Sequence, residues 1–84
     1  MKASPVPLRR MRYCLLSQEG YLADLSEALV TSSTAIMTDD AAQALQYVSF
    51  EKAIESCLLI RDTVSVKPVA VTFELEGDNK WSPR

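Results

Sequence analysis

The sequence predicts a small α+β fold, a two-layer sandwich in which one main helix covers a small antiparallel sheet of three to four strands, in the order β-β-(β)-α-β. The first observation behind this prediction is the alternation of apolar with small or polar side chains over residues 69–75, which is typical of a strand. The second is a stripe of apolar side chains at helical spacing over residues 50–61. The third is a strand-like segment over residues 11–17 that ends at a turn containing Gly20, which favours a hairpin.

Length and composition allow one domain with one core. The chain has 84 residues, of which 48% are apolar and 24% charged, as in an ordinary globular domain. We expect a flexible arm over residues 1–8, a single domain over residues 9–76 and a polar tail over residues 77–84. No apolar run approaches the ~20 residues of a membrane span, and the apolar stretch after the first arginines is too short for a secretory signal. The expected location is therefore the cytoplasm, without membrane contact.

The first half of the domain begins with the strand over residues 11–17 and the turn at Gly20, whose missing side chain permits a positive φ. Residues 21–30 allow two interpretations. We favour a second strand that completes the hairpin, but leucines at positions i, i+3 and i+7 are also typical of an amphipathic helix. A short apolar strand over residues 34–37 follows.

The second half is expected to contain the main helix and the last strand. Thr38 is a suitable N-cap for a single helical turn over residues 39–43, and Ser49 is a suitable N-cap for the main helix. Because proline cannot donate to a strand ladder, Pro68 indicates that residues 64–67 form an edge segment or a loop before the last strand.

The residue types argue against catalysis and against a cofactor. The chain has no histidine, so the commonest general base and most zinc ligands are missing, and two glycines do not make a phosphate-binding loop. Cys14 and Cys57 lie in apolar runs, where a thiol is expected to be buried and reduced. Asp39 and Asp40 open a helical turn, which accounts for them without a metal ion. We expect a protein that is not an enzyme and that has neither a cofactor nor a metal.

Charge is unevenly distributed along the chain. Residues 1–12 carry four basic side chains and no acid, whereas residues 19–55 carry seven acids and a single base, Lys52. The acidic segment either keeps the protein soluble or docks on a basic surface, including a surface that normally binds nucleic acid. If it docks, the expected contact residues are Asp24, Glu27, Asp39, Asp40 and Glu55.

A pattern of short motifs over residues 12–75 resembles small uncharacterised proteins encoded by phages and other mobile elements. The matching residues are Gly20-Tyr21-Leu22, Thr38-Asp39-Asp40, Ala44-Leu45, Tyr47, Ser49, Glu51 or Lys52, and Ala53. The additional segment over residues 28–34 departs from this pattern. The resemblance implies a binding protein of the anti-CRISPR type that acts in the host-cell cytoplasm.

We therefore expect a non-enzymatic protein-binding module of phage or mobile-element origin. It would inhibit or modulate a host protein, such as a nucleic-acid-binding defence nuclease, through its acidic face, without contacting nucleic acid itself. Two alternatives stay open. One is a structural or assembly subunit that forms a homodimer through an open sheet edge, over residues 64–75 or 11–17. The other is a small regulator that contacts DNA through Arg9, Arg10 and Arg12.

Overall fold

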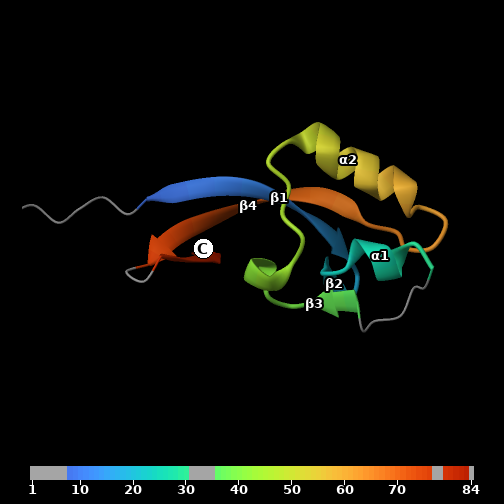
Figure 1. Cartoon of the computed structure of the whole chain (residues 1–84), viewed down its shortest axis with the longest axis horizontal. Coiled ribbons are helices and arrows are strands. Elements are labelled where there is room, and N and C mark those ends of the chain that lie inside the picture. The colour runs from blue at the N-terminus through green and yellow to red at the C-terminus, as the bar shows by residue number, and fades with distance from the viewer. Residues whose placement is uncertain (1–7, 31–35, 77–78, 84) are drawn as a thin grey trace, which may run out of the picture.

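The computed structural model describes residues 8–30, 36–76 and 79–83 and shows a small α+β fold, as predicted (Figure 1). Its sheet is antiparallel but has five strands rather than three to four. The elements in chain order are β1 (Arg9–Ser17), β2 (Gly20–Leu22), α1 (Leu25–Ala28), β3 (Met37–Thr38), the 3-10 turn η2 (Ala41–Gln43), α2 (Phe50–Leu59), β4 (Lys67–Glu76) and β5 (Lys80–Pro83).

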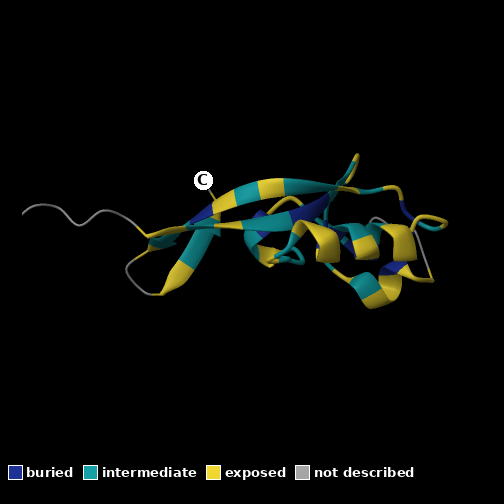
Figure 2. Cartoon of the chain, turned by 90° about the horizontal axis from the view of Figure 1, so that it is seen from above, coloured by how far each residue is buried: buried dark blue, intermediate teal, exposed yellow. Residues whose placement is uncertain are grey.

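The strand order in the sheet is β3-β2-β1-β4-β5, with β1 in the centre. The longest ladder joins β1 to β4, from Arg9 opposite Glu74 to Leu16 opposite Lys67. The predicted hairpin between β1 and β2 is confirmed, and Gly20 has a φ of +121°. Both helices lie on one side of β1 and β4, as Figure 2 shows.

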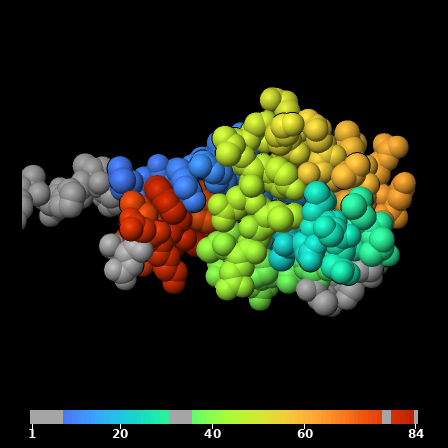
Figure 3. Space-filling model, in the orientation of Figure 1, coloured from blue at the N-terminus to red at the C-terminus, as the bar shows by residue number. Residues whose placement is uncertain are grey.

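The segment between η2 and α2 crosses β1 and pairs with it briefly. Tyr13 and Tyr47 exchange two backbone hydrogen bonds of 2.8 Å each, N–H to O in both directions. Figure 3 shows this segment and η2 on the surface between β5 and α1. Because Tyr13 bonds to Tyr47, its backbone N–H and C=O point away from β4, and those of its neighbours Arg12 and Cys14 point toward β4.

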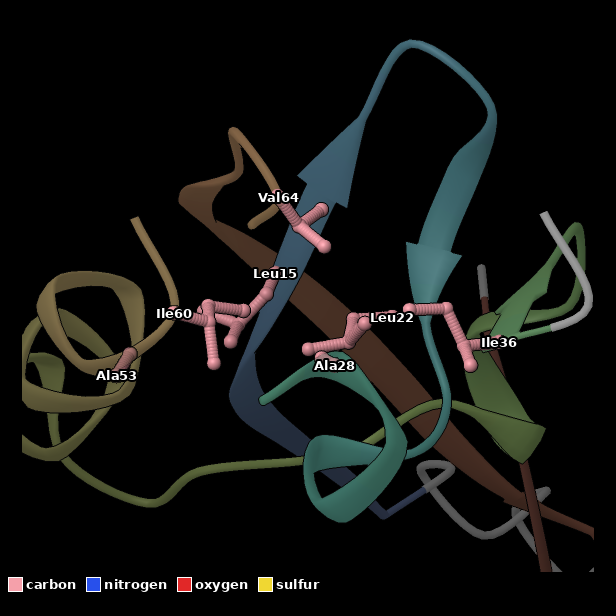
Figure 4. Close-up of a cluster of buried hydrophobic side chains, with 7 residues drawn as sticks. All are labelled: Leu15, Leu22, Ala28, Ile36, Ala53, Ile60 and Val64. Carbon is pink, nitrogen blue, oxygen red and sulfur yellow. The ribbon is translucent and has the colours of Figure 1, made fainter. Parts of the chain in front are cut away.

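The core consists of two clusters on opposite faces of the sheet, since successive strand residues point to opposite sides. The first cluster lies under α1 and α2 (Figure 4). It contains Leu15, Leu22, Ala28, Ile36, Ala53, Ile60 and Val64. The second cluster lies under η2. It contains the buried residues Cys14, Ala41 and Phe73, with Val69, Val71 and Trp81 packed against them. The apolar side of β4 therefore faces η2, while α2 covers the other side of the sheet.

Residues 21–30 combine both predicted structures. The segment starts as the short strand β2 and continues as α1, because the side chain of Asp24 caps the helix by accepting a hydrogen bond from the backbone N–H of Glu27 at 3.1 Å. The strand predicted over residues 34–37 is found at Met37–Thr38, and residues 34 and 35 lie outside the described residues.

The single helical turn also begins later than predicted. Asp40, not Thr38, is the N-cap of η2, and its carboxylate accepts from the N–H of Ala42 at 2.9 Å. The hydroxyl of Thr38 instead accepts from the N–H of Asp40 at 3.1 Å and so stabilises the turn before the cap.

The N-cap predicted for the main helix is confirmed, since the hydroxyl of Ser49 accepts from the N–H of Lys52 at 3.1 Å. The helix ends at Leu59, two residues earlier than predicted. A turn follows the helix, in which the backbone N–H groups of Thr63 and Val64 both donate to the carbonyl of Ile60, at 2.9 and 2.8 Å.

Pro68 lies inside β4, where only residues 64–66 remain irregular. It stands opposite Leu15. Because Tyr13 donates to Tyr47, the backbone groups of Tyr13 and Leu15 point away from β4, and the nitrogen of Pro68 likewise points away from β1. The missing N–H of Pro68 therefore removes no bond from the ladder.

Part of the predicted polar tail forms the fifth strand. Trp81 stands opposite Leu75, and Asn79, at a φ of 62°, turns the chain back from β4. This strand was missed because its only large apolar side chain is Trp81, which packs against the second cluster.

Candidate protein-binding surfaces

The five carboxylates predicted to contact a partner are all exposed, but they lie on three parts of the fold. Asp24 and Glu27 are at the start of α1, and Asp39 and Asp40 lie between β3 and η2. Glu55 is exposed on α2 and belongs to neither of these segments. Asp24 and Asp40 also act as helix caps, whereas Glu27 and Asp39 make no side-chain hydrogen bond to any described residue.

We define the acidic edge as the described residues 18–30 and 36–46, which form β2, α1, β3 and η2. These residues include five carboxylates and no lysine or arginine. They are Glu19, Asp24, Glu27, Asp39 and Asp40. The pairing of β2 with β3 brings the β1–β2 turn beside Asp39, whose carboxylate lies about 3.6 Å from the position that a Cβ on Gly20 would take. In the described part of the chain, no ion pair involves any of these five carboxylates.

Glu19 is the acidic-edge residue that the sequence prediction omitted. Its position in the two-residue turn was a usable signal, because turn residues between paired strands are exposed. Only the pairing of β2 with β3 shows that this turn lies next to Asp39.

A second surface feature is an open groove of about 440 Å³ between α2 and the segment before it. Glu55 and Lys52 lie along it, and the side chains of Val48 and Leu59 are 73% and 63% exposed. The groove is lined by Gln46, Tyr47, Val48, Ser49, Lys52, Glu55, Ser56 and Leu59. Its chemistry suits an apolar side chain of a partner, with one group of each charge beside it.

The arginines considered for DNA contact are engaged within the sheet. The Nε of Arg9 donates to the carboxylate of Glu74 at 3.1 Å, and Arg12 donates to the carbonyl of Met11 at 2.9 Å. The guanidinium of Arg10 stacks on Trp81, 4.1 Å from the ring centroid, and its Nε is buried without a hydrogen-bond partner among the described residues. Contact with phosphates would have to compete with these interactions.

Neither cysteine has the surroundings of a nucleophile. Cys14 is buried in the second cluster, Cys57 is half-buried beside the first, and both are free thiols. Burial raises the pKa of the Cys14 thiol and the pKa of the Cys57 thiol above the ordinary value. Both side chains are therefore protonated at neutral pH, the form that neither attacks substrates nor binds metals.

These raised pKa values predict a loss of stability in alkaline solution. Above pH ~8.5 the unfolded chain releases thiol protons that the folded chain keeps, so the free energy of unfolding falls as the pH rises. The free energy of unfolding, measured with urea at neutral and alkaline pH, should fall less steeply in Cys14→Ala than in the unsubstituted chain. Equal slopes would show that the Cys14 thiol does not titrate differently in the two states.

Two further findings concern the described residues. They include no group of three or more acidic, cysteine or histidine side chains that is placed to hold a metal ion. None of their helices is long and apolar enough to span a bilayer.

In comparisons with known proteins, no family model, curated protein or solved structure matches the chain. The phage-protein resemblance therefore stays a prediction from the sequence motifs.

Proposed function

We propose that this chain is a non-enzymatic protein-binding module that docks through its acidic edge on a basic surface of another protein. The observation that supports the proposal most directly is the set of five exposed carboxylates on residues 18–30 and 36–46, in which the turn that carries Glu19 lies beside Asp39. No base lies within the acidic edge, and none of the five carboxylates is in an ion pair with a described residue. A host protein whose basic surface normally binds nucleic acid has the matching chemistry, in line with the resemblance to mobile-element proteins.

The charge distribution is expected to raise the association rate with a basic partner rather than to supply one tight contact. An exposed ion pair contributes only about 0–1 kcal/mol, but several carboxylates on one surface together attract a basic partner and speed the encounter. The basic side chains of the sheet lie on other strands, since Arg9, Arg10 and Arg12 are in β1, Lys67 starts β4 and Lys80 starts β5.

The assembly-subunit alternative has an observation of its own. The outer edge of β4 is free of any described strand over residues 67–72. This edge lies on the far side of β1 from β2 and β3, whereas η2 packs against β5.

The sharpest test reverses charge where the fold does not depend on it. Glu27→Lys combined with Asp39→Lys changes two exposed carboxylates that accept no hydrogen bond from a described residue, whereas reversal of Asp40 would also remove the cap of η2. With a partner captured from a lysate of the source cells, we expect the association rate to fall by about tenfold or more at low salt. The difference from the unsubstituted chain should shrink as salt is added.

The matched control is Asp62→Lys combined with Glu76→Lys, which changes two exposed carboxylates outside the acidic edge and alters the net charge equally. This variant should associate nearly as fast as the unsubstituted chain. Asp40→Asn completes the series, since it keeps an oxygen for the N–H of Ala42 while removing one charge. If the Glu27/Asp39 variant associates normally, or if the control slows equally, the acidic edge is not the docking surface.

A further inference from the structure

A cavity of about 410 Å³ lies at one end of the acidic edge, between the β1–β2 turn and the loop that joins α2 to β4. Figure 4 shows Val64, in this loop, beside the end of β1. The turn contributes Gln18 and Glu19 to the lining, the loop contributes Thr63 and Ser65, and β3 contributes Met37.

Hydrogen bonds hold both sides of the cavity in place. The hydroxyl of Ser17 accepts from the backbone N–H of Glu19 and donates to the carbonyl of Gly20, both at 3.0 Å. On the other side, the backbone N–H of Thr63 donates to the carbonyl of Ile60 at 2.9 Å. The cavity is therefore formed without a ligand, which lowers the entropy cost of binding one.

Four side chains at the cavity have hydrogen-bonding capacity left. None of them makes a side-chain hydrogen bond or ion pair with a described residue, and they are the amide of Gln18, the carboxylate of Glu19 and the hydroxyls of Thr63 and Ser65. Each of the four can accept a hydrogen bond, and Glu19 also carries a negative charge. A positively charged ligand that donates several hydrogen bonds matches this set.

An arginine side chain has the matching chemistry. Its guanidinium carries five N–H donors in one plane and no acceptor, so it can bond to the turn and to the loop together, whereas an ammonium group offers three donors at one point. Met37 is half-buried and provides apolar surface for the aliphatic part of the side chain. Asp39 adds negative charge nearby, because its carboxylate lies beside Gly20, the residue after the turn.

A basic residue limits where a cation can bind. Lys67 is exposed at an adjoining cavity of about 330 Å³, which shares Ser17, Gln18 and Ser65 with the first cavity. Because like charges repel, we expect the cation on the side of Glu19 and not on the side of Lys67. The two residues should therefore have opposite effects on binding.

We propose that the cavity binds an arginine side chain that projects from the basic surface of the partner. Glu19 pairs with the guanidinium, and the other three uncommitted side chains accept its remaining N–H groups. This inference rests on the proposed function, because it names the group of the partner that the acidic edge receives at this end.

An NMR titration of the isotope-labelled chain with N-acetyl-arginine amide tests the cavity without the partner. The backbone amide signals of Gln18, Glu19, Thr63 and Ser65 should shift saturably, with the weak affinity that a single side chain allows. N-acetyl-citrulline amide has nearly the same shape but no charge, and it should bind at least about tenfold more weakly. N-acetyl-lysine amide should also bind more weakly, because it offers fewer donors.

Three variants assign the binding to the cavity. Glu19→Gln should weaken the binding of the arginine amide by about tenfold, since it removes the charge and keeps the shape. Glu27→Gln is the matched control, because Glu27 is an exposed carboxylate of the acidic edge that does not line the cavity, and its affinity should change by less than about twofold. Lys67→Gln should keep or tighten the binding.

The proposal is overturned by the absence of a saturable shift, or by citrulline or lysine amide binding as tightly as arginine amide. Unchanged affinity in Glu19→Gln, an equal loss in Glu27→Gln or weaker binding in Lys67→Gln overturns it as well. A failure of the proposed function is distinguishable from these results. If arginine amide does not bind but reversal of Glu27 and Asp39 slows association, the acidic edge docks without this cavity. If arginine amide binds but the reversal has no effect, the cavity takes arginine and the acidic edge is not the docking surface.

Discussion

Phe73→Ala is expected to lower the free energy of unfolding by about 3–5 kcal/mol, because it removes a fully buried aromatic ring and leaves a cavity. Phe73, on β4, is 0% exposed and is the largest buried side chain of the second cluster. A small domain has only about 5–15 kcal/mol of stability in total, so a large part of it is at stake. Urea unfolding followed by the fluorescence of Trp81, the only tryptophan and a neighbour of this cluster, measures the loss.

Phe50→Ala is the matched control, since it removes the same side chain from a half-exposed position at the start of α2. Phe50 is 48% exposed and makes an edge-to-face contact with Tyr13 at a centroid distance of 5.5 Å. Its removal should cost about 1–2 kcal/mol, mainly the aromatic contact and part of the buried area. If Phe50→Ala destabilises the chain as much as Phe73→Ala, the second cluster does not contribute to the core as described.

Gly20→Ala is expected to lower the free energy of unfolding by about 2–3 kcal/mol, because side chains other than glycine rarely adopt its φ of +121°. A Cβ at this position would also lie about 2.8 Å from the backbone carbonyl oxygen of Thr38, so β3 would have to move. The damage should concentrate at the acidic edge, which depends on the pairing of β2 with β3. Hydrogen exchange of the β2 and β3 amides should therefore rise more than that of β1 and β4.

Glu19→Ala, one position earlier in the same turn, is the control for Gly20→Ala. The Glu19 side chain is exposed and makes no hydrogen bond or ion pair with a described residue, so its removal should change the stability by less than about 0.5 kcal/mol. A Gly20→Ala variant as stable as Glu19→Ala would mean that the β1–β2 turn relaxes without strain.

Features that depend on neighbouring residues were predictable from the sequence. The α+β class, the hairpin at Gly20, the N-cap at Ser49 and the strand with alternating side chains all follow from local backbone and side-chain preferences. The exposure of Asp24, Glu27, Asp39, Asp40 and Glu55 was also implicit in their charge. Whether these carboxylates bind a partner stays a prediction.

Features that depend on distant pairing were not predictable. A lone tryptophan in a polar segment does not show that Lys80–Pro83 is a strand, since that strand exists through its pairing with β4 and the stacking of Arg10 on Trp81. Pro68 lies within a strand because its nitrogen points away from β1, a fact set by the register between β1 and β4.

By itself, then, the sequence determined the types of the main elements and the uneven charge, because caps, turns and periodicity act over a few residues. The tertiary structure decided which faces of the sheet are covered, which turn lies beside Asp39 and which described strands pair. The physical reason is that strand register and sheet order arise from contacts between segments far apart in the chain, and a change in either moves side chains between core and solvent.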